Sequence, residues 1–287
     1  MRLLRIEWMK LKGNKSFWIF SLIFMVFLPF LVVLLPSMLG GEVSGGVKMY
    51  PLMPKTAENT WYIVTLTSSY FTMFILAFIL IYHIVNEFNY RTARQNVIDG
   101  FSRMQYLQGK LLLMLLLCVL ATIYVFLTGL IATSYFGSIP REELTSFTEM
   151  MGGMMGTKPV VIEYGGLLEG VSMVGNYFLQ ILAYFSFAMF VSFLLRKGAL
   201  AILVFFASFL IEVIGRGILS AYGYETIVSY LPLKSMSMIL PNPGIETIVS
   251  GMAVPNPATI ENIVVVLIYS GVFILGSILL FKKRDIS

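Results

Sequence analysis

The chain has 287 residues, of which 58% are hydrophobic and 12% are charged, and its net charge is +5. A soluble domain carries about 25% charged residues, so this chain has too few ionic groups for a water-facing surface, and an ordinary cytosolic enzyme is excluded. The composition indicates an integral membrane protein, in which the excess of Lys and Arg reflects membrane topology and anionic lipid headgroups rather than nucleic acid.

Residues 1–15 precede the first apolar run and predict a short amphipathic helix. Leu4, Trp8 and Leu11 share one face of this helix, and basic residues lie roughly opposite. We expect such a helix to lie in the cytoplasmic headgroup layer, with Trp8 at the interface with the lipid bilayer. Glu7 falls near the apolar face and makes the pattern imperfect, so a basic leader that only sets topology is the alternative.

Residues 16–287 are interpreted as one membrane domain. A run of about 20 apolar residues covers the hydrocarbon core of a bilayer. Six such runs predict six membrane-spanning helices, at about residues 16–39, 62–85, 111–137, 172–195, 199–220 and 260–281. The expected fold class is therefore an all-α integral membrane protein.

The basic residues divide unequally between the two sides that six spans define. Fourteen of the 20 Lys and Arg fall in the N-terminal segment, the second-to-third and fourth-to-fifth connections, and the C-terminus. Cytoplasmic segments of membrane proteins carry such an excess. We therefore expect a multi-pass protein of the cytoplasmic (inner) membrane with both termini in the cytoplasm.

The connections on the opposite side are long and rich in Gly and Pro. A short helix is expected to begin near Arg141, because Pro140 suits the first turn of a helix. Residues 221–259 carry five prolines around apolar pieces that are too short to span a membrane. These pieces predict short interfacial or re-entrant outer helices before the last span.

Residues 86–110 form the only expected cytoplasmic connection long enough to hold structure of its own. The second span is expected to continue as a helix to about Val97, and Asp99-Gly100 predicts a turn. Ser102 is expected to cap the helix that leads into the third span, because its hydroxyl can accept from unpaired N–H groups.

The tip of this helix–turn–helix has the composition of a docking element. Ile98 and Phe101 would form an apolar plug rimmed by charged residues. Such a plug suits a groove on a soluble partner.

This segment resembles the ABC-2 type transporter permeases. These permeases have a Glu at the end of the second span, a polar run, a small-residue turn, and then Ser-Arg and Lys before the third span. The corresponding residues here are Glu87, Arg91–Asn96, Asp99-Gly100, Ser102-Arg103 and Lys110. The amphipathic N-terminal helix and the six spans also resemble that family, whereas Arg91-Thr92 stands where many members have Gly-Thr.

The resemblance implies a permease subunit of an ATP-binding cassette exporter, which moves a substrate while a separate ATPase subunit binds ATP and Mg²⁺. It also implies a second permease in the working unit, either another copy or a homologous chain. The residues to which it assigns coupling with the ATPase are Glu87, Arg91, Arg94, Gln95, Asn96, Asp99, Gly100, Phe101, Ser102, Arg103 and Lys110.

The chain itself is not expected to be an enzyme or to carry a cofactor. A phosphate-binding loop needs G-x-x-x-x-G-K-[ST], and the only Gly-Lys pair, Gly109-Lys110, has Met104 and Leu111 at the other required positions. One His and one Cys are too few for a His/Cys metal site, so no metal is expected. His83 is interpreted as a hydrogen-bonded packing residue that could also sense the neighbouring connection.

Two charged residues lie inside the fifth span. Glu212 and Arg216 are four residues apart, face the same way and could pair. They either line the outer part of a pathway or gate, or lock this span to an outer helix.

Two other classes of function stay open on the sequence. An ion-coupled secondary transporter usually carries carboxylates at the membrane midplane and paired repeats, and Glu212 is the only such feature here. A membrane scaffold or sensor that transports nothing is the other alternative. Copurification with a separate ATPase would distinguish the exporter from both.

Overall fold

The structure is a computed structural model, and it describes residues 2–38, 42–43, 47–48, 57–90, 92–98, 100–136, 167–240 and 259–283. The regular secondary structure of these residues is helical, apart from a short antiparallel hairpin of β1 (Glu42–Val43) and β2 (Val47–Lys48). Six helical segments are long and apolar enough to cross a membrane. This confirms the predicted all-helical class and the number of candidate spans.

The candidate spans are α2, the combined α3–η1–α4, α6, α8, α9 and α13. In chain order the helices are α1 (Arg2–Lys12), α2 (Lys15–Met38), α3 (Ala57–Phe71), η1 (Thr72–Leu76), α4 (Ala77–Asn89), α5 (Thr92–Ile98), α6 (Arg103–Phe136), α8 (Leu167–Leu195), α9 (Gly198–Ala221), α10 (Glu225–Ser229), α11 (Pro232–Ser237) and α13 (Ile260–Lys283). Helix α6 begins well before the predicted span, because the polar end of the preceding connection continues directly into it.

The second span is not a uniform α-helix. The π-helix η1 separates α3 from α4, and it buries Thr72, Met73 and Leu76. A π-turn adds a residue to one helical turn and shifts the side-chain stripe that follows. The hydroxyl of Thr72 is hydrogen-bonded to the hydroxyl of Tyr177 in α8. Hydrophobic periodicity gives no sign of this turn.

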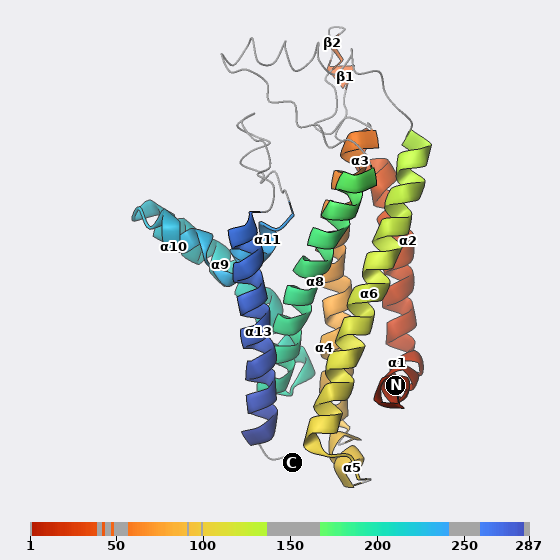
Figure 1. Cartoon of the computed structure of the whole chain (residues 1–287), viewed down its shortest axis with the longest axis vertical. Coiled ribbons are helices and arrows are strands. Elements are labelled where there is room, and N and C mark those ends of the chain that lie inside the picture. The colour runs from red at the N-terminus through yellow and green to blue at the C-terminus, as the bar shows by residue number, and fades with distance from the viewer. Residues whose placement is uncertain are drawn as a thin grey trace.

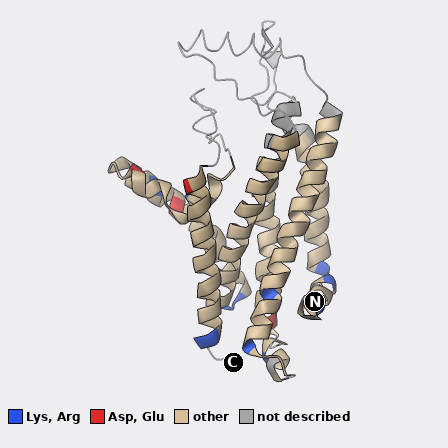
Figure 2. Ribbon diagram, in the orientation of Figure 1, with Lys and Arg blue, Asp and Glu red and all other residues tan. Residues whose placement is uncertain are grey.

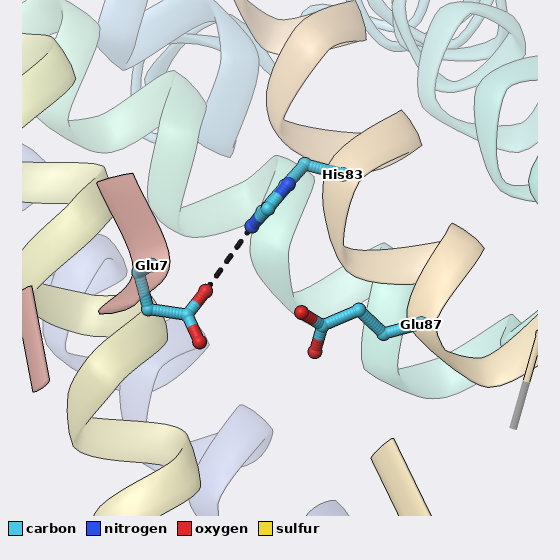
Figure 3. A group of neighbouring side chains, drawn as sticks. All are labelled: Glu7, His83 and Glu87. Atoms are coloured by element: carbon cyan, nitrogen blue, oxygen red, sulfur yellow. Dashed lines mark hydrogen bonds and ion pairs between the residues drawn. The ribbon is translucent and has the colours of Figure 1, made fainter. Parts of the chain in front are cut away.

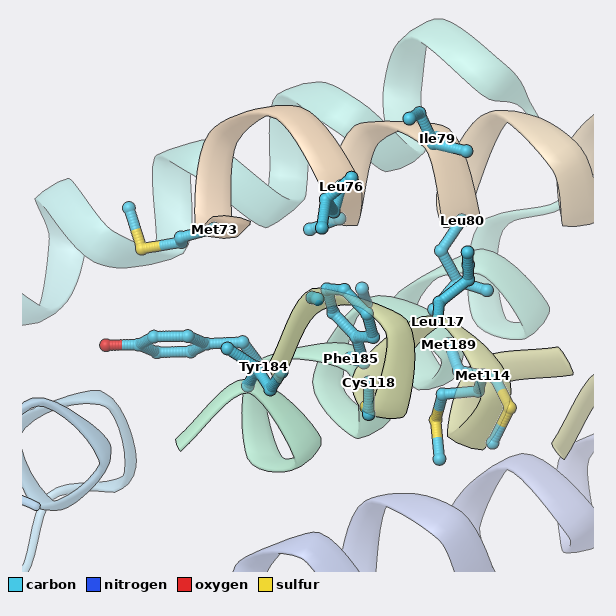
Figure 4. Packing of buried hydrophobic residues seen from close by; sticks show 14 of the residues in the cluster. Met73, Leu76, Ile79, Leu80, Met114, Leu117, Cys118, Tyr184, Phe185 and Met189 are labelled. Carbon is cyan, nitrogen blue, oxygen red and sulfur yellow. The ribbon is translucent and has the colours of Figure 1, made fainter. Parts of the chain in front are cut away.

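Helix α8 lies at the centre of the bundle (Figure 1), where it packs against α3, α4, α6, α9 and α13. Side chains of α4, α6 and α8, including Leu80, Leu117 and Phe185, interdigitate in the core (Figure 4). In contrast, α9 leans away from the other spans and carries α10 at its far end (Figure 1). Close packing is a main source of stability between helices in a membrane, so α8 joins these five helices, whereas α2 packs mainly on α3 and η1 and α1 packs mainly on α6.

Three helices close around Trp61 near the start of α3. Its side chain is 2% exposed, and it lies against Gly129 of α6 and Gly170 of α8. A Cβ at these two glycines would lie 2.2 and 2.4 Å from the indole ring. Only glycine therefore permits this approach of α6 and α8 to the tryptophan.

Basic residues are concentrated at one end of the helix bundle. Both chain ends lie at the same end (Figure 1), and Lys and Arg gather there (Figure 2). Of the predicted outer segment, the structure describes α10 and α11, which are too short to span a membrane. The expected helix near Arg141, residues 241–258, and the predicted coupling residues Arg91 and Asp99 lie outside the described residues.

Candidate functional site

Five ionisable side chains meet where α1, α4 and α6 come together, and we name them the charge cluster. They are Glu7 and Lys10 from α1, His83 and Glu87 from α4, and Lys110 from α6. Lys110 has no exposed surface, and Glu7, His83 and Glu87 are 4%, 5% and 6% exposed. Ionised side chains are rarely buried unless they are paired, so this cluster is the main candidate site.

Lys110 lies at the centre of the charge cluster. Its ammonium contacts Glu7 Oε2, and it lies 2.9 Å from Glu87 Oε1 and 3.2 Å from His83 Nε2. Lys10 closes the other side, with its Nζ 3.1 Å from Glu87 Oε1 and 3.4 Å from Glu7 Oε1. Two ammonium groups therefore balance two carboxylates within the cluster.

The imidazole of His83 makes two contacts through a single nitrogen. Its Nε2 lies 3.1 Å from Glu7 Oε2 (Figure 3) and 3.2 Å from Lys110 Nζ. The nitrogen donates to Glu7 only when it carries a proton, and it accepts from Lys110 only when it does not. The two hydrogen bonds exclude one another, so His83 has two alternative hydrogen-bonding states at the same place.

Helical spacing explains how these side chains reach one site. His83 and Glu87 are four residues apart on α4, and the two α1 members are three apart, so each pair lies on one face of its helix. Gly109 allows α1 to approach α6 closely, because a Cβ there would lie 3.2 Å from Glu7 Cγ. A small residue therefore directly precedes Lys110, the central cation.

The neighbouring charges keep Glu7 ionised although it is buried. Burial by itself raises the pKa of a carboxyl group, because it disfavours the charged form. The hydrogen bond with His83 and the positive charges of Lys110 and Lys10 outweigh that effect and hold the pKa of Glu7 well below its usual range. Glu7 is therefore ionised at neutral pH, and the attachment of α1 depends on the cations that face it.

The charge cluster also contains a set of metal-ligand atoms. One ligand atom each from Glu7, His83 and Glu87 lies within 4.8 Å of the others, and carboxylate oxygen and imidazole nitrogen are common ligands of Zn²⁺. The ammonium of Lys110 contacts all three side chains, so it takes the place that a metal ion would need. In this arrangement the cluster is an ion-pair network with lysine as its central cation.

The connection between α4 and α6 begins directly beyond the charge cluster. The prediction of one helix to about Val97 is wrong, because α4 ends at Asn89 and Tyr90 has φ −90° and ψ 7°. Thr92 starts the separate helix α5, and its hydroxyl donates to Glu87 O at 3.2 Å. Threonine hydroxyls often bond the backbone in this way at helix ends, and here the bond ties α5 to the last turn of α4.

Asn96 links α5 to the charge cluster. Lys10 Nζ donates to Asn96 Oδ1 at 3.4 Å, and the same ammonium contacts Glu7 and Glu87. One side chain of α1 therefore bridges α4 and α5. A displacement of α5 would disturb the contacts of Lys10.

The turn that follows α5 is built on Gly100, which has φ 98°. Phe101 N donates to Asn96 O at 3.1 Å, which closes the end of α5. Ser102 Oγ accepts from Gln105 N at 3.1 Å, while Gln105 Oε1 accepts from Ser102 N at 2.9 Å. This reciprocal capping box starts α6 and confirms the predicted N-cap at Ser102.

The predicted coupling residues that the structure describes differ in how deeply they are buried. The exposed members are Arg94, Gln95, Gly100, Ser102 and Arg103. Phe101 and Asn96 are half-buried, whereas Glu87 and Lys110 lie in the charge cluster at the base of the connection. A docked partner would touch the tip, and Glu87 and Lys110 would act on it only through the helices that carry them.

Sequence reasoning missed the two α1 members of the cluster. Helix α1 packs on α6, with Leu11 fully buried and Leu4 and Trp8 half-buried. The ring of Trp8 lies edge-on to Phe17, with centroids 5.8 Å apart. The signal in the sequence is Glu7 itself, because an acidic residue beside the apolar face of a helix indicates a buried partner.

Glu212 and Arg216 lie on α9, away from the charge cluster. Glu212 accepts from Leu233 N at 2.9 Å and from Lys234 N at 2.6 Å, in the first turn of α11. Unpaired N–H groups at a helix start favour such a carboxylate. No salt bridge joins Glu212 to Arg216, both of which the structure describes, so Glu212 fastens α9 to the outer helix through the backbone.

Comparison with known proteins gives one family. The chain matches, over residues 30–287, a family described as "Protein of unknown function (DUF2705)". No curated protein matches the chain. The matched region includes His83, Glu87 and Lys110 and begins after α1. Because the match covers most of its length, the chain belongs to the DUF2705 family.

Proposed function

We propose that this chain is the membrane-spanning permease subunit of an ATP-binding cassette exporter of the ABC-2 type, moving a substrate across the cytoplasmic membrane. A separate ATPase subunit, which binds ATP and Mg²⁺, would supply the energy. A second permease, identical or homologous, would complete the membrane unit. In this proposal both chain ends and the connection between α4 and α6 face the cytoplasm.

One observation carries the proposal: an exposed tip is mounted on a buried junction of three helices. Ile98 at the tip is 69% exposed, and Tyr90 at the start of the connection is 75% exposed. The charged residues Arg94 and Arg103 of the same segment are also exposed. Exposed apolar side chains rimmed by polar ones are typical of a docking surface. The density of polar residues in this connection favours a location in water, where a soluble partner can reach it.

The charge cluster would hold α4 and α6 rigidly together at the base of the tip. Separating α1, α4 and α6 would leave charges unpaired in a medium of low dielectric constant, which is costly. A push on α5 would therefore move α4 and α6 together rather than open their ends. ATP would drive transport by binding more tightly to the ATPase in one of two arrangements of the spans.

Copurification with an ATPase co-expressed from the adjoining gene tests the proposal. We expect Ile98→Asp and Phe101→Ala to reduce retention of the ATPase strongly while membrane insertion is unchanged. Ile227→Asp is the matched control, because Ile227 is 52% exposed and lies on α10 at the opposite end of the bundle. ATPase retention that is unaffected by both tip variants would contradict the proposal.

The charge cluster is also the feature that an ion-coupled carrier would share, since buried Glu, His and Lys form proton relays in transporters. Its place at one end of the bundle, at the base of an exposed tip, favours a mechanical role. Transport by the purified chain alone, driven by a proton gradient in proteoliposomes, would support the carrier instead.

A further inference from the structure

Arg216 is a cation in a candidate membrane span that forms no salt bridge with any residue that the structure describes. It lies in α9, and its Nε is buried without a hydrogen-bond partner. Across the part of the chain that the structure describes, no hydrogen bond or salt bridge reaches its guanidinium. Charged side chains in membrane spans pair with other groups or face water, so Arg216 is suited to an anion that the described chain does not supply.

Glu212, one helical turn away, does not supply that anion. Its two carboxylate oxygens accept the backbone N–H groups of Leu233 and Lys234. It is also the only acidic residue of α9. An anion that binds the Arg216 guanidinium directly would therefore have to come from outside this helix.

The surface around Arg216 is suited to a lipid. Val213, three residues before Arg216 and on the same face of α9, is 52% exposed, and Tyr222 and Tyr224, just beyond the end of α9, are 75% and 54% exposed. Exposed tyrosines are typical of the membrane–water interface. Tyr222 follows Arg216 by less than two helical turns, or about 9 Å. A long arginine side chain can extend over that distance toward the headgroups.

We propose that Arg216 binds the phosphate group of an anionic phospholipid whose acyl chains lie along the exposed face of α9. The planar guanidinium matches two phosphate oxygens at once. A second copy of this chain fits less well, because α9 offers no free carboxylate to a symmetric partner. The site lies in the membrane leaflet away from the chain termini, and it does not depend on coupling to an ATPase.

Photo-crosslinking of the full chain in vesicles of equal parts phosphatidylglycerol and phosphatidylcholine tests this site. A benzoylphenylalanine at Val213, which shares the Arg216 face of α9, should form adducts mainly with phosphatidylglycerol. Arg216→Gln should lower that preference about tenfold, and Arg216→Lys should keep most of it. Leu203 is the matched control position, because it is 62% exposed in the other half of α9, where adducts should follow the bulk composition.

The Tm shows whether the variant folds. Arg216 has no described protein partner, so Arg216→Gln should unfold at the same temperature as the wild-type chain. A preference for phosphatidylglycerol that survives in folded Arg216→Gln would overturn the proposal, as would its absence from the wild type. Adducts to a second protein chain in place of lipid would also overturn it, and would assign this face of α9 to an interface between copies.

Discussion

The ammonium of Lys110 lies 2.9 Å from Glu87 Oε1, and the Lys110 side chain is completely buried. This pair joins the first part of α6 to the last part of α4, on either side of the connection that carries the exposed tip. Glu7 and Lys10 complete the charge balance from α1. The base of the connection is therefore held together by a set of buried charges that links three helices.

Lys110→Met should destabilise the protein strongly, because it leaves two buried carboxylates facing one ammonium. Removal of one partner from a buried ion pair costs about 3–5 kcal/mol. In the double variant Lys110→Met with Glu87→Gln, the charges of Glu7 and Lys10 still balance each other. The double variant should therefore lose less stability than Lys110→Met alone. The Tm in detergent is compared for Lys110→Met, Glu87→Gln and the double variant. If the Tm of the double variant falls by as much as the two single variants together, charge balance is not what stabilises the cluster.

Lys110→Ala should convert the charge cluster into a metal site. Without the ammonium, the ligand atoms of Glu7, His83 and Glu87, which lie within 4.8 Å of one another, are free to bind Zn²⁺. Zn²⁺ at about 100 times its Kd would stabilise the variant by about 2.7 kcal/mol. The Tm of the wild-type chain should not respond, and His83→Gln should remove the response from the variant. A folded Lys110→Ala variant that ignores Zn²⁺ would count against the geometry described here.

Acid should weaken the attachment of α1 through Glu7. The folded-state pKa of Glu7 lies below its usual value of 4.5, so its ionisation stabilises the folded protein above that pH and this contribution is lost as the pH falls below it. The Tm of the wild type should therefore drop more steeply below about pH 4 than the Tm of Glu7→Gln, and the two should run in parallel between about pH 5 and 7. Parallel acid profiles throughout would contradict a buried, ionised Glu7.

Gly170→Ala should destabilise the bundle, and Gly175→Ala on the same helix should not. A Cβ at Gly170 would lie 2.4 Å from the ring of Trp61, whereas nothing lies within 4 Å of a Cβ at Gly175. Overpacking of a tight site costs about 1–3 kcal/mol, while Ala at an open helical site favours the helix by up to about 1 kcal/mol. Thermal unfolding of the two variants under identical conditions checks the difference. Equal stabilities would show that α8 is not packed tightly on Trp61.

The apolar runs predict the candidate spans closely, as at α9, which occupies Gly198–Ala221 against a prediction of 199–220. Each span is one continuous stretch of sequence, so local composition is enough to predict where it begins and ends. The charge cluster is different, because Glu7, Glu87 and Lys110 lie in three helices and meet only when α1 packs on α6. The break at Tyr90 also escapes prediction, since no Gly or Pro marks it.

Site-directed crosslinking between the tip and the proposed ATPase subunit tests the central claim most directly. Cys118 is the only cysteine and is buried, so Cys118→Ala combined with Ile98→Cys provides a single reactive thiol at the tip. Leu168→Cys in the same background is the control, because Leu168 is 85% exposed near the other end of the bundle. With a reagent that joins a thiol to nearby lysines, the account predicts that the ATPase is crosslinked to the Ile98→Cys chain and not to the Leu168→Cys chain. No crosslink to the Ile98→Cys chain, or equal crosslinking of both, would contradict it.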